Sequence, residues 1–458
     1  MHTIIHGDCL EELKKLEDNS VDAVICDPPY GLSNTKPTQV ADVLAAWVTG
    51  DTEKVPAKRG GFMGADWDSF VPPPAVWEEC MRVLKPGGHM AVFAGARTQD
   101  FMGLSIRLAG FEIRDTLGWI YGSGFPKSMD VSKAIDKAAG AEREVVGRTK
   151  TPFKVDAAAH RGTSLQGSVN GDFSKQVDEN GYRYTEHTAP ATSEAAKWDG
   201  WGTALKPAIE PIILARKPLD GTVANNVLAH GVGGLNIDAC RVETSDSLYR
   251  DSSIAKVVGD SEIHEGWDRP YRHSQELVDK ANEETRIKSE KADRLGRFPA
   301  NVLLDEHAAK EMDKQSGVLQ SGKMKPTHTT ASRDVFGQNA KGGYTTMETY
   351  GDSGGASRFF PVFKYQAKAP KKERPVIVRE DGTKVQHPTV KPLKLMEWLV
   401  TLITPEGGTV LDPFAGTGTT LQAATNKGFN PIGIEADADY IQLINKRMEG
   451  GTPSTRSN

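Results

Sequence analysis

The segment Cys-Asp-Pro-Pro-Tyr-Gly, residues 26–31, contains the residue types best suited to recognising an amino group on a planar ring. Asp27 supplies a carboxylate acceptor, and Pro28 and Pro29 fix φ and remove two N–H donors. Backbone carbonyls beside the prolines are then free to accept hydrogen bonds from an exocyclic amine. Tyr30 adds an aromatic ring on which a planar base can stack. A simple structural turn is the alternative for this segment taken alone.

A second segment, residues 409–420 with the sequence TVLDPFAGTGTT, has the pattern of a strand, a glycine loop and a helix. Gly416 and Gly418 let the backbone approach a ligand closely. Leu421 stands where dinucleotide enzymes prefer a third glycine. The next predicted strand ends in Glu435, an acid that can accept hydrogen bonds from both ribose hydroxyls. A tight turn beside an exposed acid is the alternative, but the loop and the acid together favour a nucleotide-like ligand.

Alternating strands and helices are predicted at both ends of the chain, where they would position the two motifs. Residues 1–126 read as strands separated by helices, residues 385–449 show the same alternation, and residues 210–218 read as one further strand. This pattern predicts an α/β fold with a parallel, doubly wound sheet. Each motif follows a predicted strand, and ligands bind at the carboxyl ends of strands in such sheets.

Composition excludes several function classes. The length of 458 residues allows two or three domains, and a net charge of −5 excludes a globally basic, histone-like binder. The sequence has no run of about 18 apolar residues, so a membrane span is not expected. The first residues lack the apolar region of a secretory signal. The four cysteines form no CxxC pair, so no metal site is expected and a reducing compartment is predicted.

The two motifs together resemble those of the DNA amino-methyltransferases, which use S-adenosylmethionine to methylate adenine at N6 or cytosine at N4. The DPPY half comes first and the glycine-loop half last, an order typical of the permuted β-class of that family. Residues 6–13 (HGDCLEEL) and 387–392 (HPTVKP) match the segments that precede the two motifs in that class. Residues 201–219 and 357–369 also look like phage and prophage members. The resemblance implies a Rossmann-like, circularly permuted fold with a large inserted target-recognition region.

The resemblance also assigns roles to individual residues. Asp27, the Pro28 carbonyl, Pro29 and Tyr30 would hold the target base. The cofactor would be bound by Asp8, Thr389, Lys391, Asp412, Phe414, Gly416, Thr417, Gly418 and Glu435. Asp8 is expected near the cofactor adenine, on the strand beside the one that ends in Asp27. Lys391 and Thr389 are expected near the methionine end, and His387 is expected to be structural.

The implied reaction requires alignment more than a strong base, because a sulfonium donor is already activated. Hydrogen bonds from the amino group to Asp27 and a proline carbonyl would follow flipping of the base out of the duplex. No thiolate nucleophile is required, so Cys26 is interpreted as a small buried residue. Adenine is favoured over cytosine because serine often replaces the acid in N4 enzymes. Methylation of RNA or of a protein amide, and a non-catalytic nucleic-acid binder, are the remaining alternatives.

The predicted organisation has six segments. They are the DPPY half of the core (1–146), a flexible insertion (147–196), a core strand (197–219), a target-recognition region (220–365), the cofactor-loop half (366–449) and a disordered tail (450–458). The core is expected to be complete without residues 220–365. Residues 275–297 are charge-dense and are predicted to be a solvated helix or a loop.

Double-stranded DNA is the expected partner. Residues 150–386 carry 34 basic and 33 acidic side chains, whereas the rest of the chain is near −6, and this shift favours a DNA-facing middle region. Arg294, Arg297 and Arg358 are the predicted DNA contacts. A homodimer and a cognate restriction endonuclease are the further partners considered, and the expected location is the cytoplasm of a bacterial or phage-infected cell.

Overall fold

The structure is a computed structural model whose described residues form two separate units. The described residues are 2–32, 37–50, 70–122, 124, 128–154, 182–244, 274–320, 353–363, 374–379, 381–387 and 389–449. The larger unit lies within residues 1–123 and 209–458, and the smaller unit within residues 124–208. No helix in these ranges is both long and apolar enough to cross a membrane.

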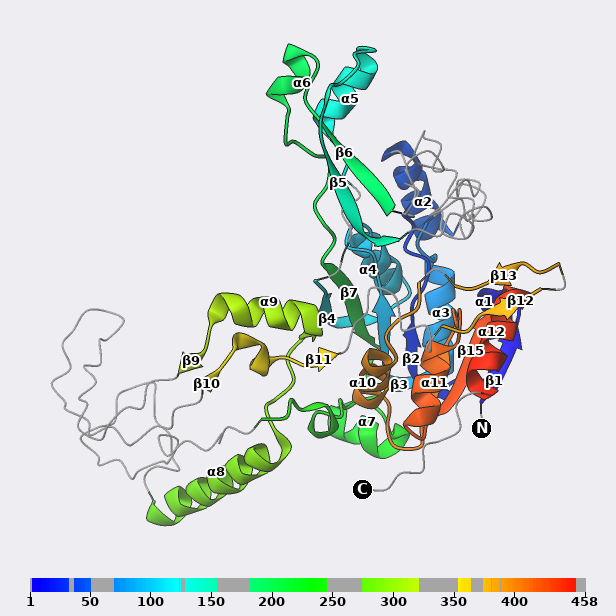
Figure 1. The fold of residues 1–458 in the computed structure, drawn as a ribbon. Coiled ribbons are helices and arrows are strands. Elements are labelled where there is room, and N and C mark those ends of the chain that lie inside the picture. The colour runs from blue at the N-terminus through cyan, green and yellow to red at the C-terminus, as the bar shows by residue number, and fades with distance from the viewer. Residues whose placement is uncertain are drawn as a thin grey trace, which may run out of the picture. The chain divides into compact units, whose positions relative to one another are not determined.

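A sheet of nine strands, counted over the described residues, forms the centre of the larger unit (Figure 1). In spatial order these are β1 (Thr3–His6), β15 (Asn430–Glu435), β14 (Thr409–Asp412), β2 (Val21–Cys26), β3 (Leu84–Phe93), β7 (Ile209–Arg216), β4 (Glu112–Ile120), β8 (Val302–Asp305) and β11 (Val362–Phe363). The chain proceeds from β14 to β15 on one side and from β2 to β3 on the other. The point between β14 and β2 is therefore the topological switch point, where ligands bind in such sheets. This order confirms the predicted Rossmann-like α/β fold.

Strand β7 departs from the prediction of a wholly parallel sheet, because it runs antiparallel to both β3 and β4. The last residue of β4, Ile120, pairs with the first residue of β7, Ile209. The chain thus leaves β4 and returns to β7 at the same edge of the sheet. A strand that starts at the edge where the previous one ended must run in the opposite direction.

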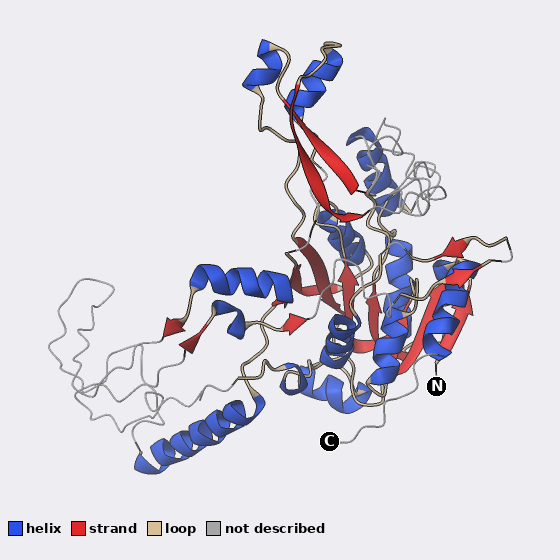
Figure 2. Cartoon of the chain, in the orientation of Figure 1, coloured by secondary structure: helices blue, strands red, loops and turns tan. Residues whose placement is uncertain are grey.

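Helices cover both faces of the sheet (Figure 2). The described helices of the larger unit, not all of which lie on the sheet, are α1 (Cys9–Leu13), α2 (Pro37–Thr49), α3 (Pro74–Val83), α4 (Gln99–Leu108), α7 (Val223–His230), α8 (Gln275–Leu295), α9 (Glu306–Ser316), α10 (Leu393–Ile403), α11 (Thr419–Asn426) and α12 (Ala438–Glu449). Every residue of β2 is buried, because Ala23 and Ile25 face α10 and α11 while Val24 and Cys26 face α1, α3 and α4. The interpretation of Cys26 as a small buried residue is confirmed.

The shorter elements complete the larger unit. They are the 3₁₀ turns η5 (Asp238–Cys240) and η9 (Ala356–Phe359), the pair β9 (Leu319–Gln320) with β10 (Ser353–Gly354), and the pair β12 (Ile377–Val378) with β13 (Lys384–Val385). Helix α3 ends at Val83, before the Pro-Gly-Gly segment 86–88. Residues 84–88 belong to β3, where Leu84 pairs with Val21 across an irregular register.

The sheet is not complete without residues 220–365, which corrects the expectation from the sequence. Strand β8 pairs in parallel with β4, and β11 pairs with β8. Leu303, Phe363 and Cys240 are buried in the core that also contains α10. Short strands of four and two residues extend this edge, and such strands carry too little periodicity to be recognised in sequence. The charge-dense segment forms helix α8.

The smaller unit contains α5 (Val131–Ala138), β5 (Val145–Lys154), β6 (Tyr182–Thr188) and α6 (Ser193–Lys197). Strands β5 and β6 form an antiparallel hairpin. The limits of this unit, 124–208, are wider than the predicted insertion at 147–196, because α5 packs with the segment that follows the hairpin. Residues 155–181, part of the predicted flexible insertion, and the predicted tail 450–458 lie outside the described residues.

Candidate active site

Four acidic side chains follow four strands that end at one edge of the sheet. In spatial order Asp8 follows β1, Glu435 ends β15, Asp412 ends β14 and Asp27 follows β2. The sequence placed the strand of Asp8 beside that of Asp27, but β15 and β14 lie between them. The Asp8 carboxylate caps helix α1 by accepting two backbone N–H groups, at 3.0 Å from Leu10 and 3.3 Å from the next residue. Asp8 thus lies on the outer strand, next to Glu435.

The side chains of Asp27 and Tyr30 are joined by a direct hydrogen bond. The Tyr30 hydroxyl donates to Asp27 Oδ1 at 2.7 Å, and the Thr98 hydroxyl donates to the Tyr30 carbonyl at 2.6 Å. The turn closes at Gly31, whose φ of +64° and close neighbours require glycine, since a Cβ there would lie 2.7 Å from the backbone nitrogen of Val71. The four residues Asp27–Tyr30 therefore form a fixed loop at the carboxyl end of β2.

Lys391 joins this loop and was assigned by sequence to the cofactor side. Its Nζ lies 2.8 Å from the Tyr30 hydroxyl, 3.1 Å from Asp27 Oδ1 and 2.9 Å from Glu210 Oε2. The amine also lies 4.7 Å from the centre of the Phe93 ring. The structure thus places the amine of Lys391 beside Asp27 and Tyr30 of the DPPY loop.

Glu210 was not predicted from the sequence, although it is the acid at the start of β7, where the chain re-enters the sheet. The Lys391 side chain is only 11% exposed. Burial opposes its charge, but Asp27 and Glu210 outweigh that penalty, so the pKa of Lys391 is raised. Lys391 is a permanent cation held between two carboxylates. For Tyr30, burial and then the charges of Asp27 and Glu210 raise the pKa well above its usual value, so the hydroxyl remains a donor.

The glycine loop begins at Asp412, which is 3% exposed. Its Oδ1 accepts the backbone N–H of Phe414 at 3.0 Å. Burial, reinforced by Asp27 and Glu435, raises the pKa of Asp412 to about 7. The Phe414 ring packs against the buried Trp77 of α3 at a centroid distance of 6.2 Å. Asp412 and Phe414 therefore fix the start of the glycine loop through this hydrogen bond and through packing on Trp77.

Glu435, at the end of β15, and Gly416 of the glycine loop are both half-buried and contact each other. The backbone N–H of Gly416 donates to Glu435 Oε2 at 2.7 Å, and that of Asp437 donates to Oε1 at 2.9 Å. Burial raises the pKa of Glu435. Gly416 has a φ of +53°, and a Cβ there would meet no atom closer than His387 Nε2 at 3.8 Å. A Cβ at Gly416 would therefore be in ordinary van der Waals contact, and it is the positive φ that favours glycine at this position.

Gly418 and Thr417 have a different, packing role. Gly418 has a φ of +76°, and a Cβ there would lie 2.9 Å from a methyl of Ile444 in α12. Arg447 of α12 donates to the Thr417 carbonyl at 2.7 Å and to the Thr417 hydroxyl at 3.2 Å. These contacts hold Thr417 and Gly418 against α12, and they fix the part of the loop that follows Gly416.

Residues 192–446, more than half of the chain, match a family model described as DNA methylase, of the N6_N4_Mtase type. The chain belongs to this DNA methylase family. The matched range includes Glu210, Lys391 and the glycine loop. It begins after Asp27 and Tyr30, so the role of the DPPY loop in this methylase family member depends on the geometry.

Three curated relatives match parts of this family member. The Type II methyltransferase M2.DpnII of Streptococcus pneumoniae is 44% identical over 64 residues, 14% of this chain and 24% of the relative. The Type II methyltransferase M.HindIII of Haemophilus influenzae is 25% identical over 252 residues, 51% of this chain and 64% of the relative. The DNA adenine methyltransferase YhdJ of Escherichia coli is 35% identical over 121 residues, 26% of this chain and 34% of the relative. The chain thus spans less than two thirds of each relative's length.

The segment 387–391 connects the two halves of the site in this methylase family member. The His387 ring packs on Tyr440 at a centroid distance of 4.8 Å, and its Nδ1 contacts both the backbone N–H and the carbonyl of Thr389. Burial lowers the pKa of His387, which favours the neutral ring. His387 therefore borders the loop at Gly416, whereas Lys391 reaches Asp27. Thr389 is exposed between them.

The three predicted DNA contacts are placed differently from one another. Arg297 and Arg358 lie over the ring of Phe359, with guanidinium-to-centroid distances of 4.7 and 4.2 Å. Arg358 also donates to the carbonyls of Gly354 and Gly355, both at 2.7 Å. These two arginines therefore have structural contacts within the protein. Arg294 is exposed in the last turn of α8, and its contact with DNA stays a prediction.

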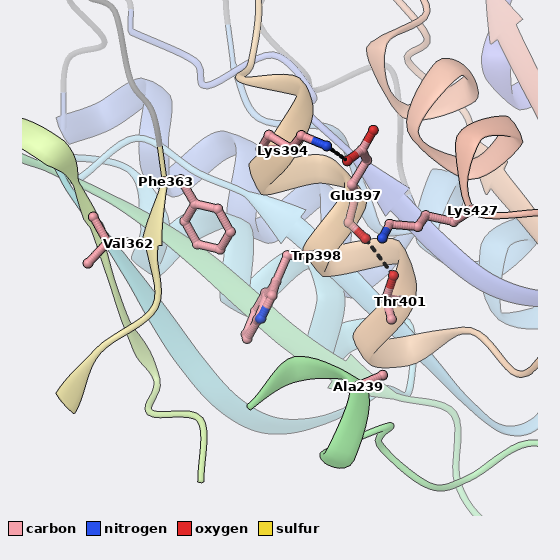
Figure 3. Close-up of a pocket in the computed structure, with 8 residues that line it drawn as sticks. All are labelled: Ala239, Val362, Phe363, Lys394, Glu397, Trp398, Thr401 and Lys427. Atoms are coloured by element: carbon pink, nitrogen blue, oxygen red, sulfur yellow. Dashed lines mark hydrogen bonds and ion pairs between the residues drawn. The ribbon is translucent and has the colours of Figure 1, made fainter. Parts of the chain in front are cut away.

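An open pocket of about 470 Å³ lies elsewhere in the methylase, between η5, β11 and α10 (Figure 3). Its lining residues are Ala239, Val362, Phe363, Lys394, Glu397, Trp398, Thr401 and Lys427. Glu397 Oε2 accepts Lys394 Nζ at 2.7 Å, and Glu397 Oε1 accepts the side-chain amide of Asn426 at 2.8 Å. The lining includes none of the motif residues, and the internal hydrogen bonds of its carboxylate indicate a structural role.

Proposed function

We propose that this chain is a site-specific DNA methyltransferase that transfers a methyl group from S-adenosylmethionine to the exocyclic N6 of adenine. The observation that supports it most strongly is the position of the two loops. The DPPY loop follows β2 and the glycine loop follows β14, on the two sides of the switch point of the sheet. A base bound on one loop and a methyl donor bound on the other would meet at the same crevice.

The base side of the site has the groups that an adenine amino group needs. The Asp27 carboxylate and the Pro28 carbonyl accept the two amino hydrogens, and this draws the nitrogen lone pair out of conjugation with the ring. Tyr30 provides the stacking surface, and its hydrogen bond to Asp27 holds the ring in place. A base in duplex DNA can reach these groups only after it flips out of the stack.

The cofactor side fits S-adenosylmethionine. The carboxylate of Glu435 is positioned by two backbone N–H groups and can accept the ribose hydroxyls, while the Gly416 backbone permits close approach. Asp412 and Phe414 shape the loop, and Asp8, beside the strand of Glu435, is proposed to lie near the cofactor adenine. The cofactor, when bound, supplies an activated methyl group on a sulfonium.

The charge of the site suits a cationic donor. Among the described residues, Asp27 and Glu210 place two carboxylates around the ammonium of Lys391, and Glu435 ends β15 beside the glycine loop. The excess of negative charge stabilises a sulfonium and the positive charge that develops on the attacked amine. Lys391 is proposed to fix the orientation of Asp27 and Tyr30 rather than to act as a base, because its ammonium does not lose its proton near neutral pH.

The chain order supports assignment to the permuted β-class, since the DPPY strand β2 precedes the cofactor strand β14 in the sequence. Adenine is proposed over cytosine because Asp27 stands where serine is frequent in N4 enzymes, and because one relative is described as a DNA adenine methyltransferase. Two relatives are described as Type II methyltransferases, which supports a restriction–modification context with a cognate endonuclease. The phage-like segments 201–219 and 357–369 support a phage or prophage source.

Target recognition is proposed for that part of residues 220–365 which does not build the sheet. Helices α8 and α9 and the turn η9 remain once β8, β11 and α7 are assigned to the core. Arg294 at the end of α8 is the exposed candidate for a phosphate contact. Exchange of the α8 segment, residues 274–297, which leaves β8 in place, with the matching segment of a relative that methylates another sequence would change the methylated site.

Nucleoside mass spectrometry tests the proposed reaction. DNA and RNA isolated from cells that express the chain are digested and compared with those from cells that express Asp27→Ala. N6-methyladenine in DNA that depends on Asp27 is the expected result, and N4-methylcytosine in its place would reassign the base. Methylated nucleosides confined to RNA, or none at all with intact cofactor binding, would contradict the proposal.

A further inference from the structure

The hairpin β5–β6 of the smaller unit is a two-stranded ribbon. In the described part of the chain its strands pair only with each other. Side chains on the ribbon are well exposed, with Val146 at 62% and the Arg148 side chain at 63%. An isolated hairpin of this kind is marginally stable in water, so its preservation requires either a strong anchor or a binding partner.

The base of the ribbon has such an anchor. Asp136 of α5 is buried, and its carboxylate accepts the backbone N–H groups of Ala191 and Thr192, both at 3.0 Å, and the Thr192 hydroxyl at 2.7 Å. Arg143, just before β5, donates to Asp136 at 2.6 Å and to the Thr188 hydroxyl at the end of β6 at 2.9 Å. This network locks both ends of the ribbon to α5. The ribbon is consequently presented as a rigid element.

The two strands of the ribbon carry an excess of basic residues, whereas the rest of the smaller unit does not. Strands β5 and β6 contain four basic residues and one acid, while the other described residues of the smaller unit contain five basic residues and six acids. Lys150 extends across one face and lies 3.7 Å from the centre of the Tyr182 ring. Arg148 lies on the same face, where Glu186 partners it at 2.8 Å. An exposed ion pair of this kind is weak, so a phosphate can replace Glu186.

We infer that the hairpin β5–β6 contacts the phosphate backbone of DNA, with Arg148 and Lys150 as contacts. A two-stranded ribbon has the width that the major groove of B-DNA admits, and basic side chains along it meet phosphates at the groove walls. The inference rests on the proposed function, because it assumes that the substrate is duplex DNA. It adds a DNA contact outside residues 220–365.

The connection of the chain supports this assignment. The smaller unit is inserted between β4 and β7, at the carboxyl edge of the sheet. The first residues of β7 include Glu210, which binds Lys391 in the active site. The hairpin therefore belongs to an insertion that is joined in the chain to β4 and to β7, the strand that contains Glu210.

The salt dependence of DNA binding tests the inference. Each phosphate contact contributes about 0.9 to the slope of log affinity against log salt concentration, so Arg148→Ala/Lys150→Ala should lower that slope by roughly 1.8. The KM for DNA should rise, whereas kcat at saturating DNA, S-adenosylmethionine affinity and sequence choice should be unchanged. Arg148→Lys/Lys150→Arg should restore the slope. The matched control is Lys133→Ala/Lys137→Ala in α5, which removes two charges outside the ribbon.

The outcomes separate this inference from the proposed function. If the wild-type chain neither binds nor methylates DNA, the proposed function fails first. If the wild type methylates DNA and the ribbon variant keeps the wild-type slope, the hairpin assignment alone is wrong. An equal loss in the α5 control would show a general charge effect and would also overturn it. A wild-type slope combined with altered self-association, measured by sedimentation, would assign the ribbon to a protein contact instead.

Discussion

Substitution of Glu210 tests whether the ion network around Lys391 orients the catalytic loop. The Lys391 ammonium has three hydrogens, and three acceptors lie within 3.1 Å of it, on Tyr30, Asp27 and Glu210. Glu210→Ala removes one acceptor and its charge. The ammonium is then balanced by Asp27 alone, and it draws that carboxylate away from the substrate amine.

The structure sets the size of this effect. A hydrogen bond to a charged group is worth about 1.5–3 kcal/mol, and 1.36 kcal/mol corresponds to a tenfold change in rate. Glu210→Ala should therefore lower kcat by roughly 10- to 150-fold. Glu210→Gln keeps an acceptor and loses only the charge, a difference of about 1 kcal/mol, so it should lower kcat by roughly fivefold.

The assay is methyl transfer to DNA at saturating substrates, with S-adenosylmethionine affinity measured separately by calorimetry. Glu112→Gln is the control, because Glu112 binds Arg216 at 2.6 Å in the same sheet but has no contact with Lys391 among the interactions described. If Glu210 acts through Lys391, the double variant with Lys391→Met should be no slower than Lys391→Met alone. A Glu210→Ala variant with wild-type kcat, or one that loses cofactor binding as severely as kcat, would refute the reasoning.

Three further predictions concern the two loops. Asp27→Ala should abolish methyl transfer and keep cofactor affinity. Gly416→Val should weaken cofactor binding severely, because a β-branched residue is strained at the φ of +53°. Kinetics and calorimetry on both variants test this, and loss of cofactor binding in Asp27→Ala would contradict it. Tyr30→Phe should lower kcat about tenfold by removing one bond to Asp27, and Tyr30→Ala should lose a further 1–3 kcal/mol of base stacking; equal losses would exclude a role for the ring. Asp412, with its pKa raised from 3.8 to about 7, keeps its proton longer when folded than when unfolded. Wild-type stability should therefore fall between about pH 4 and pH 7, by up to about 4 kcal/mol from this group. Asp412→Asn should flatten that dependence in urea titrations, and an unchanged slope would contradict the raised pKa.

The sequence located the acids at the strand ends because each belongs to a local pattern. Asp27 follows a short buried strand and Asp412 ends another. Each is followed by a residue with a distinctive backbone, Pro28 with its fixed φ and Gly416 with its access to positive φ. Glu210 escaped prediction because its importance comes from Lys391, which is 181 residues away in the chain. The direction of the Lys391 side chain had no local signal for the same reason.

The order of strands was predicted less well than their existence. Asp8 was assigned to the wrong neighbour, because periodicity identifies a strand but not the strand beside it. The antiparallel direction of β7 follows from the return of the insertion at the edge where β4 ends, a property of topology that no window of sequence contains. Arg297 and Arg358, which were predicted to contact DNA, share the ring of Phe359 because the fold brings them together, and their contact with DNA stays a prediction.

The charges of the active site have a consequence for DNA binding. Among the described residues, Asp27, Glu210 and Glu435 place three carboxylates at the carboxyl edge, against the ammonium of Lys391. This excess attracts a sulfonium but repels phosphates, so the catalytic pocket itself cannot supply the affinity for the DNA backbone. That affinity must come from basic surfaces outside the pocket. The ribbon β5–β6 carries an excess of basic residues. It can therefore make the phosphate contacts that the negatively charged pocket cannot make.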